Sequence, residues 1–297
     1  MLLYSKTSSF SIMNFSIRKI TKDDLPESLF EIPEQPENLY YTGTLPIKEN
    51  KKLCVVGSRR YTPYGKEACE KLIKGLAGYP ITIVSGLALG IDCIAHESAI
   101  SVGLQTIAVP GSGLDPSVLY PRSNINLADR IIKSGGGLFS EFDLKQKALP
   151  WTFPKRNRIM AGFSDAILVI EAEEKSGTLI TSRLATDYNK EVFAVPGSIF
   201  SPGSYGPHML IRLGATPIRN ADDILDAFGF KTEIKTEAII FNLSEEEKEV
   251  LEIIKEPISR NDILRMSQFP TSQTQAIIMS LEISGVIEER LGKITKI

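Results

Sequence analysis

The sequence of 297 residues predicts an α/β fold with a largely parallel sheet, followed by a small second domain. Two observations support this prediction. From 52 to 228, short runs of Val, Ile and Leu alternate with longer helical stretches, a pattern typical of a parallel sheet covered by helices on both faces. From 242 onward the pattern changes to helices and a closing strand pair. We therefore expect an extension at 1–45, an α/β domain at 46–230, a linker at 231–241 and a last domain at 242–297.

The elements of the α/β domain follow from local composition. Prolines at 26, 33, 36 and 46 prevent long helices in the N-terminal extension. The β-branched and apolar runs predict strands at Leu53–Val56, Ile81–Val84, Thr106–Val109, Gly137–Ser140, Ala166–Ile170, Glu191–Val195 and Thr216–Ile218. The helical stretches between them are Gly65–Leu76, Gly90–Val102, Asn124–Ser134 and Leu179–Tyr188.

Four glycine-containing turns lie at or near the ends of these strands, at 55–59, 85–90, 108–113 and 175–178. In the second turn, a β-branched run leads through Ser85 and Gly86 into a helix. Such a junction leaves backbone N–H groups unpaired at the positive end of the helix dipole, where anions bind. Ligands of open α/β sheets bind at the carboxyl ends of the strands. The four turns together therefore indicate a ligand that carries phosphate.

The distribution of charge agrees with such a ligand. The formal net charge is −2, but residues 51–160 carry 15 Lys and Arg against 8 Asp and Glu. A local excess of positive charge attracts a polyanion even when the whole protein is near neutral. A solvated surface rich in Lys and Arg is the alternative, and charge alone does not separate the two.

Several classes of protein are disfavoured by the sequence. No apolar run approaches the ~18–20 residues of a membrane helix, and the N-terminus does not resemble a signal peptide. Cys54, Cys69 and Cys93 lack a CxxC spacing, and His96 and His208 are the only histidines. We therefore expect a cytoplasmic protein with reduced thiols, no bound metal, no cofactor and no membrane partner.

The C-terminal segment has the pattern of a winged helix-turn-helix. Ser244 and Glu247 form a capping box for the first helix, a second helix follows Ile258, and a third spans Thr271–Ile283. Residues 286–297 then alternate around a glycine like a two-stranded wing. The third helix contains no Lys or Arg, which disfavours major-groove DNA binding because phosphate contacts supply most of the affinity. Docking to another protein or a structural role is favoured.

Eight motifs in this order resemble those of the DprA/Smf family, the DNA-processing proteins of bacterial transformation. They are GSRR at 57–60, SGLALGID with AH at 85–96, TIAVPGSGLD at 106–115, YP with Asn at 120–124, SEF at 140–142, FPKRNRIMAG at 153–162, VIEAEEKSGTLIT at 169–181 and VFAVPG at 192–197. The resemblance implies an extended Rossmann fold that binds single-stranded DNA without known catalysis. It also implies a homodimer that delivers the RecA recombinase onto that DNA. The N-terminal region lacks the helical bundle that some members carry.

The residues themselves offer chemistry that fits this role. Arg59 follows a strand end, where a guanidinium can bind phosphate through two hydrogen bonds, although a surface salt bridge is the alternative. Aromatic residues beside cations suit sequence-tolerant binding of single strands, and Trp151 could either stack on a base or pack in the core. The predicted DNA-binding residues are Ser58, Arg59, Ser85, Gly86, Arg122, Phe153, Lys155, Arg156, Asn157, Arg158, Ser176, Gly177 and Thr178.

Some charged residues in these motifs have a second interpretation. Arg156, Asn157 and Arg158 could brace the loops from inside. Asp92 and His96 share one helix face, and we expect them to support the loop rather than to act as an acid/base pair, because no nucleophile or metal lies nearby. Glu141 and Glu171 would repel phosphate if exposed, so they are expected to accept loop N–H groups or to pair with arginine.

Self-association is expected late in the α/β domain. In the segment 207–215, Leu210 and Leu213 are expected to face the core, and His208 and Ile211 to form the dimer interface that the resemblance implies. A two-fold axis would then place equivalent patches against each other.

Two other functions were weighed. Nucleotide phosphoribohydrolases share the broad fold and carry a GGxGTxxE signature with a catalytic Glu, but here Thr181 stands where that Glu is expected. A winged-helix transcription regulator is disfavoured by the uncharged third helix. We therefore expect a binding protein and not an enzyme.

Overall fold

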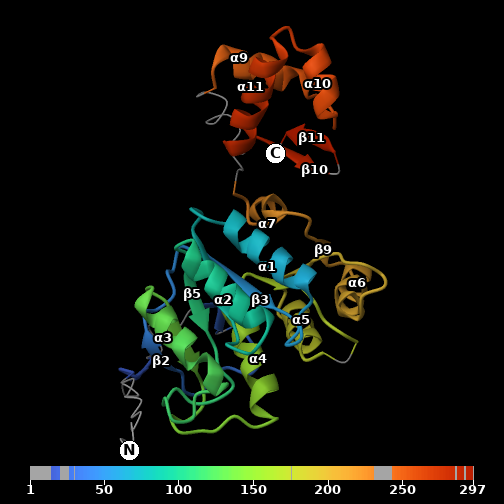
Figure 1. Ribbon diagram of the computed structural model, residues 1–297. Helices are drawn as coiled ribbons and strands as arrows, with labels where there is room; N and C mark the ends of the chain where they lie inside the picture. Colours follow the sequence, from blue (N-terminus) through green and yellow to red (C-terminus); the bar gives the residue numbers. More distant parts are fainter. Residues whose placement is uncertain are drawn as a thin grey trace, which may run out of the picture. The chain divides into compact units, whose positions relative to one another are not determined.

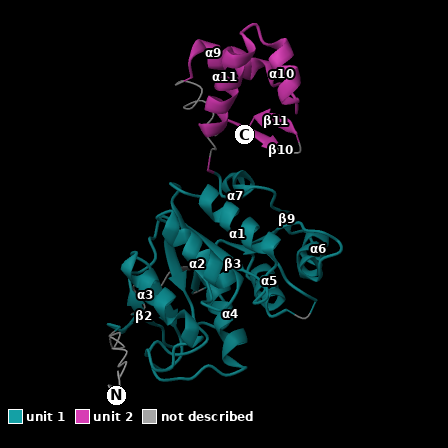
Figure 2. Cartoon of the chain, in the orientation of Figure 1, with its two compact units in different colours: residues 1–229 teal, residues 230–297 magenta. Residues whose placement is uncertain are grey.

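A nine-stranded sheet forms the centre of the larger of two compact units (Figure 1). The computed structural model describes residues 15–20, 27–29, 31–174, 176–230, 243–284, 286–290 and 292–296. The first unit spans residues 1–229 and the second residues 230–297 (Figure 2). The predicted linker at 231–241 lies outside the described residues.

The sheet has the strand order β1-β2-β6-β5-β4-β3-β7-β8-β9. Strands β3 to β9 pair in parallel, whereas β1 and β2 are antiparallel additions at one edge. The strands are β1 (Arg18–Lys19), β2 (Tyr40–Gly43), β3 (Lys51–Val56), β4 (Ile81–Ser85), β5 (Gln105–Ala108), β6 (Gly137–Ser140), β7 (Ala166–Val169), β8 (Glu191–Ala194) and β9 (Thr216–Pro217). The predicted α/β fold class is confirmed, with all seven predicted strands present.

The chain reverses its direction of growth across the sheet at β3. From β3 it builds β4, β5 and β6 on one side, and it then returns to place β7 on the other side, so β3 lies between β4 and β7. This is a topological switch point, and open α/β sheets bind ligands beyond the carboxyl ends of the strands there.

The connecting helices were predicted only in part. Those of the first unit are α1 (Pro63–Gly75), α2 (Ile91–Ser101), α3 (Ile125–Lys133), α4 (Thr152–Phe163), α5 (Thr178–Asp187), α6 (Tyr205–Arg212) and α7 (Ala221–Ala227), with short 3-10 turns η2 (Glu27–Leu29), η3 (Arg122–Asn124) and η4 (Pro202–Ser204). Helix α4 was missed because its charged run, 155–158, hides the apolar face that a helix normally presents. Arg156, Asn157 and Arg158 are all buried.

Side chains that alternate along the strands separate two core layers. Ile107 and Phe139 belong to a cluster with Ile159 and Phe163 of α4. Their chain neighbours Ala108 and Leu138 belong to another cluster with α3. Because successive strand residues point to opposite faces, helices cover both faces of the sheet.

The N-terminal region is part of the first unit. Strand β2 pairs with β6, and Leu29 and Ile32 pack so closely on α4 that a Cβ at Gly162 would lie 2.9 Å from each. The predicted boundary at residue 45 is therefore wrong. Prolines prevent long helices in this region, but they do not prevent its apolar residues from joining the core.

The second unit contains the three helices and the strand pair expected from its sequence. They are α9 (Glu245–Ile253), α10 (Arg260–Met266), α11 (Thr271–Ile283), β10 (Ile287–Arg290) and β11 (Lys293–Lys296). The Ser244 and Glu247 side chains form the predicted capping box. In the part of the chain that the structure describes, no helix is long and apolar enough to cross a membrane.

Candidate functional site

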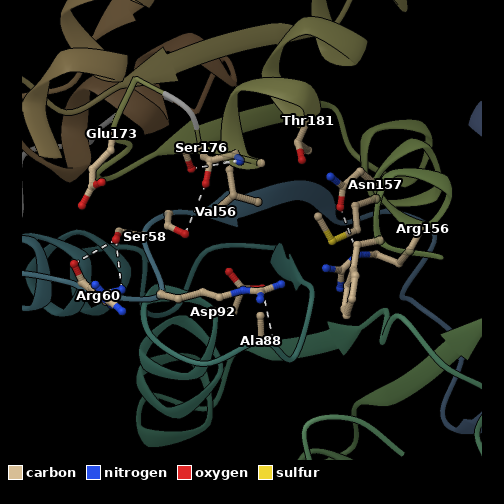
Figure 3. Close-up of a pocket in the computed structure, with 16 residues that line it drawn as sticks. Val56, Ser58, Arg60, Ala88, Asp92, Arg156, Asn157, Glu173, Ser176 and Thr181 are labelled. Atoms are coloured by element: carbon tan, nitrogen blue, oxygen red, sulfur yellow. Dashed lines mark hydrogen bonds between the residues drawn. The ribbon is translucent and has the colours of Figure 1, made fainter. Parts of the chain in front are cut away.

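A cleft of about 520 Å³ opens at the switch point of the sheet (Figure 3). Four chain segments line it: the loop after β3, the turn into α2, the buried side of α4, and the loop that leads into α5. In Figure 3, Ser176 and Thr181 lie across the cleft from Asp92 and Ala88. The lining residues are Val56, Gly57, Ser58, Arg59, Arg60, Ala88, Asp92, Phe153, Arg156, Asn157, Met160, Glu173, Ser176, Gly177, Thr178 and Thr181.

Arg59 and Phe153 form the rim of this cleft. The Arg59 guanidinium carbon lies 5.2 Å from the centre of the Phe153 ring, in a cation–π contact. Tyr120 meets the same ring edge-on, with 5.8 Å between the ring centroids. Arg59 and Phe153 also line a small hollow beside the cleft, together with Tyr120 and Gly86. No hydrogen bond or ion pair within the described segments engages the Arg59 guanidinium, so it is free to bind an anion.

Arg156 forms the floor of the cleft and is already engaged there. Its side chain is only 5% exposed. One guanidinium nitrogen donates to the carbonyls of Gly86 and Val109, and Nε donates to Oδ1 of Asn157 at 3.1 Å. Arg156 therefore ties together the turns that follow β4 and β5. Burial lowers its pKa from the ordinary arginine value.

The turn into α2 is not the empty anion site that the sequence predicts. Oδ2 of Asp92 accepts the backbone N–H of Gly86 at 3.1 Å and that of Ala88 at 3.3 Å. Ser85 is buried and donates its hydroxyl to the carbonyl of Val55 at 2.7 Å. Asp92, rather than an external phosphate, thus satisfies this turn. The buried Ser85 hydroxyl is already engaged, which corrects its predicted DNA contact, whereas Gly86 lines the hollow beside the cleft and its contact stays a prediction.

The start of α5 forms the opposite wall. The backbone N–H of Thr178 donates to Oγ of Ser176 at 3.2 Å, and the Thr178 hydroxyl donates to the carbonyl of Gly57 at 3.2 Å. Among the residues that the structure describes, no atom would lie within 4 Å of a Cβ added to Gly177, so none of them covers the backbone there. These three predicted residues line the same cleft as Ser58 and Arg59.

Other predicted DNA-binding residues lie outside the cleft lining. Arg158 is buried and forms an ion pair with Glu141, so it braces the loops. Lys155 is half-exposed and lies 3.9 Å from the same carboxylate. Arg122 is exposed beside Pro121, which lines the adjoining hollow, and no partner within the described residues engages its guanidinium. Trp151 is exposed and packs edge-on against Phe142, away from the cleft.

Glu171 accepts loop groups as predicted, whereas His96 contacts strand β5 rather than the loop that it was expected to support. Nδ1 of the fully buried His96 lies 2.7 Å from the Thr106 hydroxyl. Burial, and then the charge of Arg156, lower the pKa of His96 to about 3. Glu171 accepts the backbone N–H of Thr62 at 2.9 Å and also the Thr62 hydroxyl. Among the residues placed by the structure, no three His, Cys, Asp or Glu gather as a metal site requires.

In the segment 207–215, which was predicted to mediate self-association, the exposed residues differ in part from those predicted. Leu210 is buried as expected, but Leu213 is 76% exposed. Ile211 packs partly against the core, and Nε2 of His208 lies 3.0 Å from the carbonyl of Gly197. Ile199, Phe200 and Tyr205 line one surface hollow together with His208, and Leu213 is exposed at the end of the same helix, α6. We call Ile199, Phe200, Tyr205 and Leu213 the exposed patch, in which Phe200 is 90% exposed.

Sequence reasoning missed three contributors to the site. Arg60 and Tyr120 were noted only within motifs, although they line the cleft and the adjoining hollow. Asp92 was expected to support the loop, but its position opposite the N–H groups of the turn was not predicted. An aspartate in the first turn of a helix, two residues after Gly90, is the signal that could have indicated this.

Comparisons with known proteins agree on one family. The model for DNA recombination-mediator protein A matches residues 16–229. The chain is 42% identical to protein Smf of Escherichia coli over 69% of its own length and 54% of that protein. It is 41% identical to the DNA processing protein DprA of Streptococcus pneumoniae over 76% of each chain.

Two solved structures have the same fold. The S. pneumoniae DprA structure superposes with a TM-score of 0.66 at 41% identity, over 72% of this chain and 75% of that one. The DNA processing protein A of Helicobacter pylori, described for its single-stranded DNA binding mode, gives a TM-score of 0.65 at 30% identity, over 72% of this chain and 96% of that one.

Proposed function

The chain belongs to the DNA recombination-mediator protein A family, and on this premise we propose that it binds single-stranded DNA in the cleft and acts in DNA processing. The observation that carries the proposal is the pairing of Arg59 with Phe153 at the rim. A free guanidinium can hold a phosphate, while an aromatic ring beside it can stack on a base. Neither contact depends on base identity, so the binding should tolerate any sequence.

The other free groups extend this surface. Arg60 is an exposed cation that lines the cleft, Arg122 is an exposed cation next to Pro121 of the adjoining hollow, and the start of α5 offers a helix N-terminus to a phosphate. A strand that runs from the adjoining hollow past Arg59 to Gly177 would meet positive charge along its backbone. Phe153 and Tyr120 would meet its bases.

We further propose that the chain acts without catalysis. Thr181 lines the cleft and stands in the sequence at the position of the catalytic Glu of the phosphoribohydrolase signature, and a hydroxyl cannot supply the negative charge that stabilises an oxocarbenium-like centre. Incubation with nucleoside monophosphates should release no free base. Release of base would support the enzyme instead.

The partners belong to the same proposal. By resemblance to its family, the protein would form a homodimer and load RecA onto the bound strand, in the recombination that accompanies natural transformation. The exposed patch at Ile199, Phe200, Tyr205 and Leu213 supports self-association, because large apolar side chains at this exposure mark interaction surfaces. Two clefts in one dimer could bind one strand with a gain in effective concentration.

A competition experiment tests the proposed ligand. Labelled single-stranded DNA bound to the full chain is challenged with unlabelled single-stranded and duplex DNA of one sequence. The proposal predicts that the single strand competes at a much lower concentration, because bases in a duplex cannot reach Phe153. Equal competition by duplex DNA would favour the winged-helix regulator.

A further inference from the structure

Helices α2 and α5 of the first unit begin with residues that line the cleft, and the cap of α1, Thr62, comes two residues after the lining residue Arg60. Each helix start carries partial positive charge and unpaired N–H groups, so each could hold a phosphate. In dinucleotide-binding α/β proteins, a pyrophosphate occupies one such position. The three helix starts differ here in what already fills them.

Buried carboxylates lie at the first two helix starts. At α1, Glu171 accepts two hydrogen bonds from Thr62, the residue that caps the helix, and a Cβ on Gly65 would lie 2.3 Å from its carboxylate. At α2, Asp92 accepts the N–H groups of Gly86 and Ala88. Both carboxylates are more than nine-tenths buried. At α5, no carboxylate in the described residues accepts a hydrogen bond from the first turn.

Asp92 stands where a ligand phosphate would stand. One of its oxygens accepts two backbone N–H groups of the glycine turn, the interaction that a phosphate oxygen makes in such turns. The Arg156 guanidinium lies beside it. A Cβ on Gly86 would be 2.1 Å from Nη1 of Arg156 and 2.7 Å from Oδ2 of Asp92. Without the carboxylate, two N–H groups and a buried cation would face the cleft with no anion.

We propose that Asp92 is a specificity-determining residue that occupies the cleft's own phosphate position at the start of α2. Its carboxylate closes that position to compact anions such as inorganic phosphate, pyrophosphate and the phosphates of mono- or dinucleotides. On the proposed function, on which this last step rests, the backbone of a DNA strand is kept from the start of α2 and is held by Arg59, the start of α5 and the exposed cations Arg60 and Arg122. In this way Asp92 would exclude a nucleotide cofactor from a fold that often binds one, and the cleft would accept single-stranded DNA instead.

The first experiment does not involve DNA. The thermal midpoint of the full chain is measured against inorganic phosphate and pyrophosphate for the wild type, Asp92→Ala and Asp165→Ala. Asp165 is the matched control because it also accepts a backbone N–H, that of Lys52, but at the opposite end of β3. Asp92→Ala should gain roughly 3 °C at an anion concentration ten times its dissociation constant, beyond any response of the other two proteins. Equal responses would overturn the proposal.

The second experiment uses single-stranded DNA and a variant that keeps the shape of the turn. Asp92→Asn retains an oxygen for Gly86 and Ala88 but removes the negative charge. It should bind single strands at least about twofold more tightly at low salt, because repulsion inside the cleft is lost. In Asp92→Ala, one more phosphate of the strand can bind in the cleft. The slope of the logarithm of the binding constant against the logarithm of salt concentration should therefore become steeper by about 0.7.

These results separate the two proposals. A structural role for Asp92 alone predicts weaker DNA binding in Asp92→Asn, and that result would overturn the inference even if Asp92→Ala fails to fold. If the wild type binds no single-stranded DNA, the proposed function fails, whereas the phosphate response of Asp92→Ala still decides what Asp92 does.

Discussion

Phe153 lies beside both contacts that we propose at the cleft rim, the phosphate contact of Arg59 and the stacking of a base on an aromatic ring. Its ring holds the Arg59 guanidinium on one side and meets Tyr120 at its edge. Phe153→Ala should therefore weaken single-strand binding by ~1–3 kcal/mol, the amount that base–aromatic stacking contributes. Trp151→Ala is the matched control. Trp151 is an exposed aromatic residue just before α4, and it packs against Phe142 rather than against Arg59. Fluorescence anisotropy with a labelled oligonucleotide measures both, and equal losses would contradict the role of Phe153.

His96 makes a prediction about pH. Its pKa of about 3 in the folded state lies below the ordinary value of 6.5, because burial and the charge of Arg156 disfavour the imidazolium. Between these values the unfolded chain binds a proton that the native protein does not bind. The contribution of His96 to stability is therefore complete above pH 6.5 and is lost by about 1.4 kcal/mol per pH unit as the pH falls.

Urea unfolding between pH 6 and pH 4 measures this effect. His96→Gln should have a smaller slope of the free energy of unfolding against pH than the wild type. Identical slopes in the two proteins would show that His96 is protonated in the folded state.

Residues that follow strand ends were predictable, but buried charges were not. Arg59, Ser58, Ser176, Gly177 and Thr178 lie in the cleft because the sequence places them at the carboxyl ends of β3 and β7 or in the loops beyond. For the buried charges, the sequence offered both bracing and DNA contact and could not decide between them. Arg158 with Glu141 and Asp92 with the α2 turn are contacts set by tertiary packing, and this packing decides for bracing.

At the scale of elements, the start of α2 is positioned by a glycine. Gly90 has φ +87°, and a Cβ there would lie 2.3 Å from the carbonyl oxygen of Ser58 and 2.7 Å from Cα of Arg59. The turn into α2 and the loop that carries Arg59 are thus in backbone contact. This close approach fixes Arg59 relative to Asp92 and Gly86.

Gly90→Ala should cost more than backbone strain alone. The matched control is Gly103→Ala, because Gly103 has φ +72° but no atom within 4 Å of a Cβ. Left-handed strain costs about 1–2 kcal/mol in the control, and Gly90→Ala should exceed this and also weaken DNA binding. Denaturant unfolding compares the two variants. Equal destabilisation would mean that the loop of Arg59 does not depend on this contact.

Strand–helix alternation predicted the parallel sheet, whereas it missed the elements whose residues break the pattern. The edge strand β1 precedes the prolines at 26, 33 and 36 and β2 follows them, and α4 carries three polar residues into the interior. Their burial depends on partners that are distant in sequence, such as Glu141 for Arg158. A local pattern cannot contain that information.

At the scale of the whole molecule, the exposed patch indicates where two copies would meet. Phe200→Arg and Leu213→Arg place a charge on this patch and should convert a dimer into a folded monomer at micromolar concentration. Ile47→Arg is the control. Ile47 is also exposed, but it comes before the start of β3, whereas Ile199 and Phe200 follow the end of β8. Ile211→Arg is a poorer test, because Ile211 packs partly against the core. A dimer that persists in both patch variants in sedimentation velocity would place the interface elsewhere.

Arg59 is proposed to bind a phosphate of single-stranded DNA, and a salt titration counts such contacts. The logarithm of the binding constant falls with the logarithm of salt concentration by about 0.7 for each phosphate neutralised on a single strand. Arg59→Ala should bind more weakly and flatten this slope by about 0.7, and Arg122→Ala should act in the same direction. Arg130→Ala, whose guanidinium lies 3.3 Å from Glu97 on the surface, should leave both quantities unchanged. A folded Arg59→Ala protein with the affinity and slope of the wild type would contradict the account.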